Sequence, residues 1–110
     1  MKIESAQLNH CVVMKLEGRM DAQNAREFEA ACEDWMAKGE TRLVLDLGEF
    51  VYVSSMGLRS FLMVAKKLEG KGGGMRLCRM GGLVRQVFEI TNLLALFQHY
   101  DSSEAAVSSF

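Results

Sequence analysis

The sequence has no proline, no long apolar run and almost no net charge. With no proline, no internal repeat and no linker long enough to divide it, the 110-residue chain is expected to form one domain, residues 1–110. No stretch approaches the ~18 consecutive apolar residues of a membrane-spanning helix, so we expect no membrane insertion. The N-terminus lacks the apolar segment of a signal peptide, which indicates a cytoplasmic protein.

Charge and cysteine content exclude two further classes of function. The 13 lysine and arginine residues nearly balance the 14 aspartate and glutamate residues, whereas nucleic-acid-binding domains usually present a basic face. Nucleic acid is therefore not an expected partner. Cys11, Cys32 and Cys78 are widely separated and lie in apolar stretches. This pattern predicts buried free thiols rather than a metal or redox site.

Residues suited to catalysis are scarce. His10 and His99 are the only histidines, and neither has a serine or cysteine partner in a recognisable motif. Residues 70–74 are rich in glycine but precede an expected strand, whereas a phosphate-binding loop precedes a helix. Asp46 is expected to cap a turn, because no second acidic cluster joins it. We therefore expect no enzymatic activity, no cofactor and no metal.

Strand-like and helix-like patterns alternate along the chain. Strands are expected over residues 2–8, 10–17, 43–47, 75–78 and 96–100. Helices are expected over residues 21–38, 54–69 and 83–90 and after residue 101. The nearly continuous apolar run 43–47 is typical of a strand covered on both faces. Residues 48–53 are expected to form a loop.

Local signals suggest where these elements begin and end. Gly18 is expected to close the first pair of strands, and Gly39 to stop the first helix. Asp21 is a suitable N-cap for the first helix. Asp101 is expected to cap the last helix, with Glu104 in the capping-box position.

The order β-β-α-β-α-β-α-β-α predicts an α/β fold. We expect one mixed sheet of four to five strands, an antiparallel first hairpin, and helices packed mainly on one face. The apolar stripe of the second helix is expected to comprise Leu58, Phe61, Leu62, Ala65 and Leu68. The expected core includes Val44, Leu45, Phe61, Leu62, Val87 and Phe88.

The most informative segment is residues 52–59, where two serines and a glycine begin the second expected helix. One serine would suffice as an N-cap, a role worth about 1 kcal/mol. Gly57 lowers helix stability by roughly 0.5–1 kcal/mol and leaves room for another molecule to approach the backbone. A helix N-terminus also accommodates a phosphate, so the charge here can change without unfolding the domain. These are the properties of a binding switch.

Residues 52–59, Tyr-Val-Ser-Ser-Met-Gly-Leu-Arg, resemble the signature of STAS domains. That family contains bacterial anti-sigma factor antagonists and the cytosolic ends of sulfate transporters. Residues 18–25 resemble the loop before the family's first helix, residues 43–47 its central strand, and residues 84–93 its C-terminal portion. The resemblance covers nearly the whole chain, in the family's order of strands and helices.

The resemblance implies a partner-switching mechanism. A STAS antagonist binds an anti-sigma factor that is also a serine kinase, and thereby frees a sigma factor. Phosphorylation of the antagonist blocks this binding, and a metal-dependent serine phosphatase restores it. Many antagonists have Asp-Ser-Ser/Thr-Gly where this chain has Ser-Ser-Met-Gly, so Ser54 takes the aspartate position and Met56 that of the second hydroxyl. Ser55 is the first candidate for phosphorylation and Ser54 the alternative.

If the second and third strands are neighbours, the loop with Asp21 and the start of the second helix lie at the same end of the sheet and are expected to form one partner-binding surface. Its expected residues are Asp21, Ala22, Asn24, Ser54, Ser55, Met56, Gly57, Leu58 and Arg59. The protein is expected to be a monomer or a weak dimer.

Other functions remain open at this point. A STAS subunit could dock on a transporter ATPase without any phosphorylation, since a separate subunit needs no transmembrane segment. The altered serine motif also fits an antagonist that binds partners without being phosphorylated. A small enzyme or nucleotide-binding protein is a third possibility, although no catalytic constellation supports it.

Overall fold

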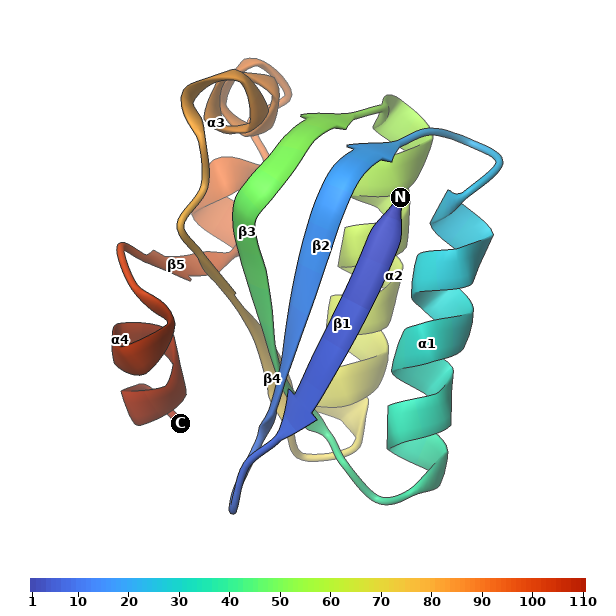
Figure 1. The fold of residues 1–110 in the computed structure, drawn as a ribbon, viewed down its shortest axis with the longest axis vertical. Helices are drawn as coiled ribbons and strands as arrows, with labels where there is room; N and C mark the ends of the chain where they lie inside the picture. The colour runs from blue at the N-terminus through green and yellow to red at the C-terminus, as the bar shows by residue number, and fades with distance from the viewer.

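The computed structural model describes residues 1–110 and contains a five-stranded sheet with four α-helices (Figure 1). The strands are β1 (Lys2–Gln7), β2 (Val12–Met20), β3 (Arg42–Val53), β4 (Gly74–Cys78) and β5 (Gln98–Tyr100). The helices are α1 (Ala25–Ala37), α2 (Ser55–Gly70), α3 (Gly82–Ile90) and α4 (Ser103–Ser108), with a short 3-10 turn at Leu94–Leu96. The α/β class and the order of elements are confirmed. No helix has both the length and the apolar character needed to cross a bilayer.

The sheet is mixed, and its strands follow the order of the sequence. β1 is antiparallel to β2, whereas β2, β3, β4 and β5 are parallel neighbours. A crossover between adjacent parallel strands needs a dozen or more residues, so a helix follows each of β2, β3 and β4. This topology brings the carboxyl ends of β2 and β3 to the same edge of the sheet.

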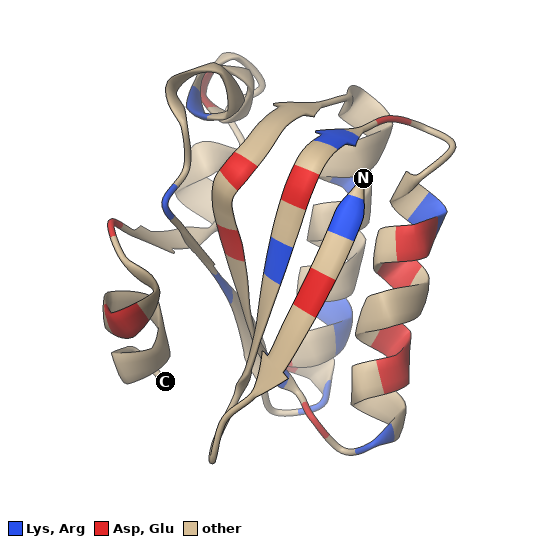
Figure 2. Cartoon of the chain, in the orientation of Figure 1, with Lys and Arg blue, Asp and Glu red and all other residues tan.

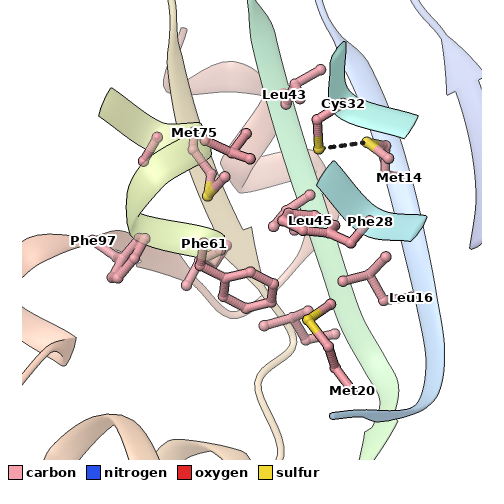
Figure 3. Close-up of a cluster of buried hydrophobic side chains, with 14 of the residues drawn as sticks. Met14, Leu16, Met20, Phe28, Cys32, Leu43, Leu45, Phe61, Met75 and Phe97 are labelled. Atoms are coloured by element: carbon pink, nitrogen blue, oxygen red, sulfur yellow. Dashed lines mark hydrogen bonds between the residues drawn. The ribbon is translucent and has the colours of Figure 1, made fainter. Parts of the chain in front are cut away.

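Helices α1, α2 and α3 contribute to the larger hydrophobic core, which lies on one face of the sheet. Figure 3 shows Phe28 and Phe61 beside Leu45 of β3. The Phe61 ring centroid lies 5.0 Å from that of Phe28, 6.1 Å from Phe50 and 6.0 Å from Phe88. Four of the six residues expected in the core are buried, while Leu62 and Val87 are only half-buried.

Helix α4 covers part of the opposite face. Ala106 packs there against Cys11, Val44 and Cys78. The expectation that residues 43–47 are covered on both faces is therefore confirmed, as is a fold with most helices on one face. All three cysteines are buried and free, and burial raises the pKa of Cys32 and Cys78 to about 12. These thiols are protonated and unreactive at neutral pH.

The predicted ends of two strands were wrong. Gly18 does not close β2, which passes through it with a φ of +94° and continues to Met20. Residues 48–53 are not a loop but the second half of β3, paired with residues 17–20 of β2. Phe50 and Val53 are buried on this extension, so long-range pairing and burial outweigh the local signals of Gly48 and Glu49.

Two helix starts and one strand start also differ from prediction. Helix α1 begins only at Ala25, because residues 22–24 form a turn after Asp21. The cap of α4 is Ser102, whose hydroxyl accepts a hydrogen bond from the Ala105 N–H at 3.1 Å. Asp101 is therefore not the cap and Glu104 is not in a capping box. Strand β5 starts at Gln98 because the 3-10 turn includes Leu96.

Candidate functional site

The carboxyl ends of β2 and β3 bring the two candidate segments together. Met20 and Val53 are partners in the β2–β3 register. The next backbone N–H, that of Ser54, donates to the Met20 carbonyl oxygen at 2.9 Å. The loop that begins with Asp21 therefore lies beside the start of α2, as expected from neighbouring parallel strands (Figure 1).

The two candidate serines occupy different environments. Ser54 is half-buried and caps α2, since its hydroxyl oxygen accepts a hydrogen bond from the Gly57 N–H at 3.2 Å. Ser55 is the first residue of α2 and is exposed. No hydrogen bond joins the Ser55 hydroxyl to another protein group. Ser54 thus has a structural role as the cap of α2, whereas the Ser55 side chain is exposed to solvent.

This difference predicts unequal effects of alanine on stability. Ser54→Ala should lower the free energy of unfolding by about 1 kcal/mol, because α2 loses its side-chain cap. Ser55→Ala should change it by less than about 0.5 kcal/mol, because an exposed hydroxyl without a partner is removed. Chemical denaturation of the two variants beside the wild type measures both values. Equal losses would contradict the capping role of Ser54.

Gly57 and Leu58 face the interior rather than a partner. Both are buried, and Leu58 is only 2% exposed. A Cβ on Gly57 would lie 2.7 Å from Cγ2 of Val53 and 3.0 Å from Sδ of Met20. The glycine therefore lets α2 pack closely on the sheet, and the prediction that it makes room for a partner was wrong. Leu58 belongs to the buried stripe of α2, so its side chain is not available to a partner.

The close approach at Gly57 gives a second stability prediction. Gly57→Ala should destabilise the protein by about 1–3 kcal/mol, because the added methyl group overpacks the contact with Val53 and Met20. Gly70→Ala at the other end of α2 is the matched control, since no atom lies within 4 Å of its added Cβ. That substitution should be neutral or slightly stabilising. Thermal melts that rise for both variants would rule out the packing role of Gly57.

The loop after β2 is held by reciprocal hydrogen bonds between Asp21 and Asn24. The Asp21 carboxylate accepts from the backbone N–H groups of Asn24 at 3.0 Å and Gln23 at 2.9 Å. These bonds hold the pKa of the Asp21 carboxyl below its usual value. The Asn24 side chain accepts from the Asp21 N–H and donates to the Arg19 carbonyl oxygen, both at 2.8 Å. Asp21 is thus a fixed, exposed negative charge, and Ala22 is exposed beside it.

Exposed apolar side chains lie on α2, β3 and α3. Met56 is 46% exposed on the first turn of α2, and Arg59 is exposed one turn further along. Val51 near the end of β3 and Leu83 at the start of α3 are 53% and 70% exposed. Both line an open groove of about 220 Å³ between these elements. Sequence reasoning missed Val51 and Leu83, although an apolar residue next to the inward-facing Val84 was a usable signal for Leu83.

No cluster of three or more His, Cys, Asp or Glu side chains in the structure could hold a metal ion. What the edge offers is a free hydroxyl at a helix N-terminus, one fixed carboxylate and exposed apolar side chains.

Comparison with known proteins gives consistent relatives. Residues 2–106 match the STAS domain family. BtrV of Bordetella bronchiseptica, to which the role of anti-sigma factor antagonist is assigned, is 40% identical over 110 residues, spanning 100% of this chain and 95% of BtrV.

Solved structures share the fold at low sequence identity. A Thermotoga maritima protein assigned the same role has a TM-score of 0.89 and 20% identity, over 97% of this chain and 92% of that one. The phosphorylated form of SpoIIAA from Bacillus has a TM-score of 0.75 and 19% identity, over 98% of both chains. Since the family match extends over nearly all residues and the fold agrees, this chain belongs to the STAS domain family.

Proposed function

We propose that this chain is an anti-sigma factor antagonist acting in the cytoplasm and controlled by phosphorylation of Ser55. Unmodified, it binds an anti-sigma factor that is also a serine kinase, and so releases a sigma factor. The kinase phosphorylates Ser55 and ends the binding, and a metal-dependent serine phosphatase reverses the modification. The antagonist role rests on the 40% identity to BtrV over the full chain.

The observation that carries the choice of serine is the contrast between Ser54 and Ser55. A kinase must reach the hydroxyl with its catalytic base and with the transferred phosphate, and Ser55 is exposed and unbonded. The Ser54 hydroxyl is half-buried and occupied by the Gly57 N–H. Its modification would disturb the cap of α2, whereas a phosphate on Ser55 adds to a helix N-terminus that favours anions.

The surroundings of Ser55 explain how a phosphate would act on binding. Met56, Val51 and Leu83 offer apolar area that a partner can cover. Arg59 and the Asp21 carboxylate supply polar contacts at the rim. A phosphate adds about −1.5 to −2 charges next to the fixed charge of Asp21. A partner matched to the neutral hydroxyl must then desolvate this charge or withdraw.

The experiment that tests this proposal is phosphate transfer followed by site mapping. The purified chain, Ser54→Ala and Ser55→Ala are each incubated with candidate anti-sigma factor kinases and ATP, and intact masses and peptides are measured. Wild type and Ser54→Ala should each gain one phosphate on Ser55, and Ser55→Ala should gain none.

A phosphate found only on Ser54 would overturn the assignment. Tight binding to a transporter ATPase, together with no phosphorylation by any tested kinase, would favour a constitutive docking subunit instead.

A further inference from the structure

The outer edge of the sheet at β1 has unpaired backbone groups. β1 is the terminal strand and pairs only with β2. No backbone hydrogen bond outside that pairing involves residues 2–7. Because alternate residues of an antiparallel edge strand direct their N–H and C=O groups away from the neighbour, a row of donors and acceptors faces outward. Figure 1 shows β1 at the margin of the sheet.

β1 lacks most of the features that prevent an edge strand from pairing with another chain. β1 contains no proline or glycine, and its register with β2 is unbroken from Lys2 to Gln7. Its only charged residues are Lys2 and Glu4, which are coloured along β1 in Figure 2. They lie on the same face of the strand, and their side chains contact each other at 2.8 Å. Because their signs are opposite, they repel a second copy only in some registers.

Successive side chains of β1 point to opposite faces of the sheet, and this restricts how two β1 strands can pair. Two copies related by a two-fold axis perpendicular to the sheet form an antiparallel pair in which opposite residues share a face. The pairing must then be centred on a residue. A pairing centred on Glu4 sets the two Glu4 carboxylates opposite each other. A pairing centred on Ser5 sets Glu4 opposite the uncharged Ala6 of the second copy. A pairing centred on Ile3 sets Lys2 opposite Glu4 of the partner subunit, and this contact occurs twice.

We propose that β1 is a self-association edge, through which two copies of this chain pair antiparallel in the register centred on Ile3. The two Lys2–Glu4 contacts across the interface select that register. A single pair of short strands buries less than the roughly 1,000 Å² of a stable interface, so the dimer is weak and depends on concentration. The inference does not rest on the proposed role of Ser55. That residue lies at the carboxyl end of β3, whereas the self-association edge is the outermost strand, β1.

Sedimentation equilibrium of the full chain over a concentration series tests this with charge reversals. Lys2→Glu sets two carboxylates opposite each other in both contacts across the interface, and Glu4→Lys sets two ammonium groups opposite each other. Each variant alone should dimerise roughly ten-fold or more weakly than wild type, because two attractive pairs become repulsive. An equimolar mixture of the two variants should recover association, because both contacts of a mixed dimer then join a carboxylate of the Lys2→Glu copy to an ammonium group of the Glu4→Lys copy.

Two controls separate pairing from changes in net charge or folding. Lys66→Glu and Glu69→Lys, on the exposed side of α2, carry the same charge changes and should associate like wild type. Ile3→Cys should form a disulfide-linked dimer under mild oxidation, because the two copies of residue 3 face each other, whereas Ala6→Cys should not. A wild type that stays monomeric at millimolar concentration, or a mixture no better associated than either variant alone, would overturn the proposal.

Discussion

Ser55→Asp should weaken binding to the anti-sigma factor kinase by roughly two orders of magnitude. The neutral Ser55 hydroxyl at an interface needs only one or two hydrogen bonds. A carboxylate in its place must be stripped of water beside the Asp21 charge, and a desolvated, unpaired charge costs several kcal/mol. A loss of ~3 kcal/mol corresponds to about a 100-fold change in affinity. Calorimetric titration against the kinase measures it.

Two control substitutions show whether the loss of affinity depends on a negative charge at position 55 in particular. Ser55→Ala should bind the kinase about as tightly as wild type but resist phosphorylation. Ser108→Asp adds the same charge on α4, at an exposed position on the opposite side of the sheet, and should leave affinity unchanged. The Ser55→Asp fold should be intact in thermal melts, because a carboxylate suits a helix N-terminus. Equal affinities for wild type, Ser55→Ala and Ser55→Asp would exclude Ser55 as the switch.

Phe61→Ala should lower the free energy of unfolding by about 3–5 kcal/mol, a large part of the 5–15 kcal/mol typical of a domain. Phe61 is completely buried, and its ring lies among those of Phe28, Phe50 and Phe88. Removing the ring leaves a cavity between α1, α2 and β3 that rigid strands cannot fill. Urea denaturation of the variant measures the loss.

Met63→Ala is the matched control on the same helix. Its side chain is 38% exposed, so its truncation should cost less than about 1 kcal/mol. If the two substitutions had equal effects, Phe61 would not be the centre of the core.

The elements best predicted from the sequence are those whose pattern is set locally. The apolar run 43–47 and the stripe of α2 contain enough hydrophobic residues to fix the type of element and the buried face. Ser54 and Gly39 also mark real helix ends, because a single side chain or a positive φ is sufficient there.

The second halves of β2 and β3 could not be predicted in the same way. Their pairing includes two register shifts, between Lys15 and Glu17 and between Gly18 and Arg19. Such irregularities break the alternation on which sequence reasoning depends. The stabilisation comes from residues about 30 positions apart in the chain, as for Met20 and Val53, so no local window reports it.

The candidate site was predicted only in part for a related reason. The family resemblance identified the segment, but it could not tell which side chains face the solvent. Gly57 and Leu58 proved to be interior, while the exposed Val51 and Leu83 were missed. Burial at the start of α2 depends on how closely the helix approaches Val53 and Met20, which is a tertiary property.

The most direct test of the switch uses one protein sample in two chemical states. The chain phosphorylated on Ser55 is titrated against the anti-sigma factor kinase, and the same sample is titrated again after treatment with a serine phosphatase. Binding should be about 100-fold or more weaker in the phosphorylated state and should return to the unmodified affinity once the phosphate is removed. An affinity that is the same before and after dephosphorylation would contradict control by Ser55.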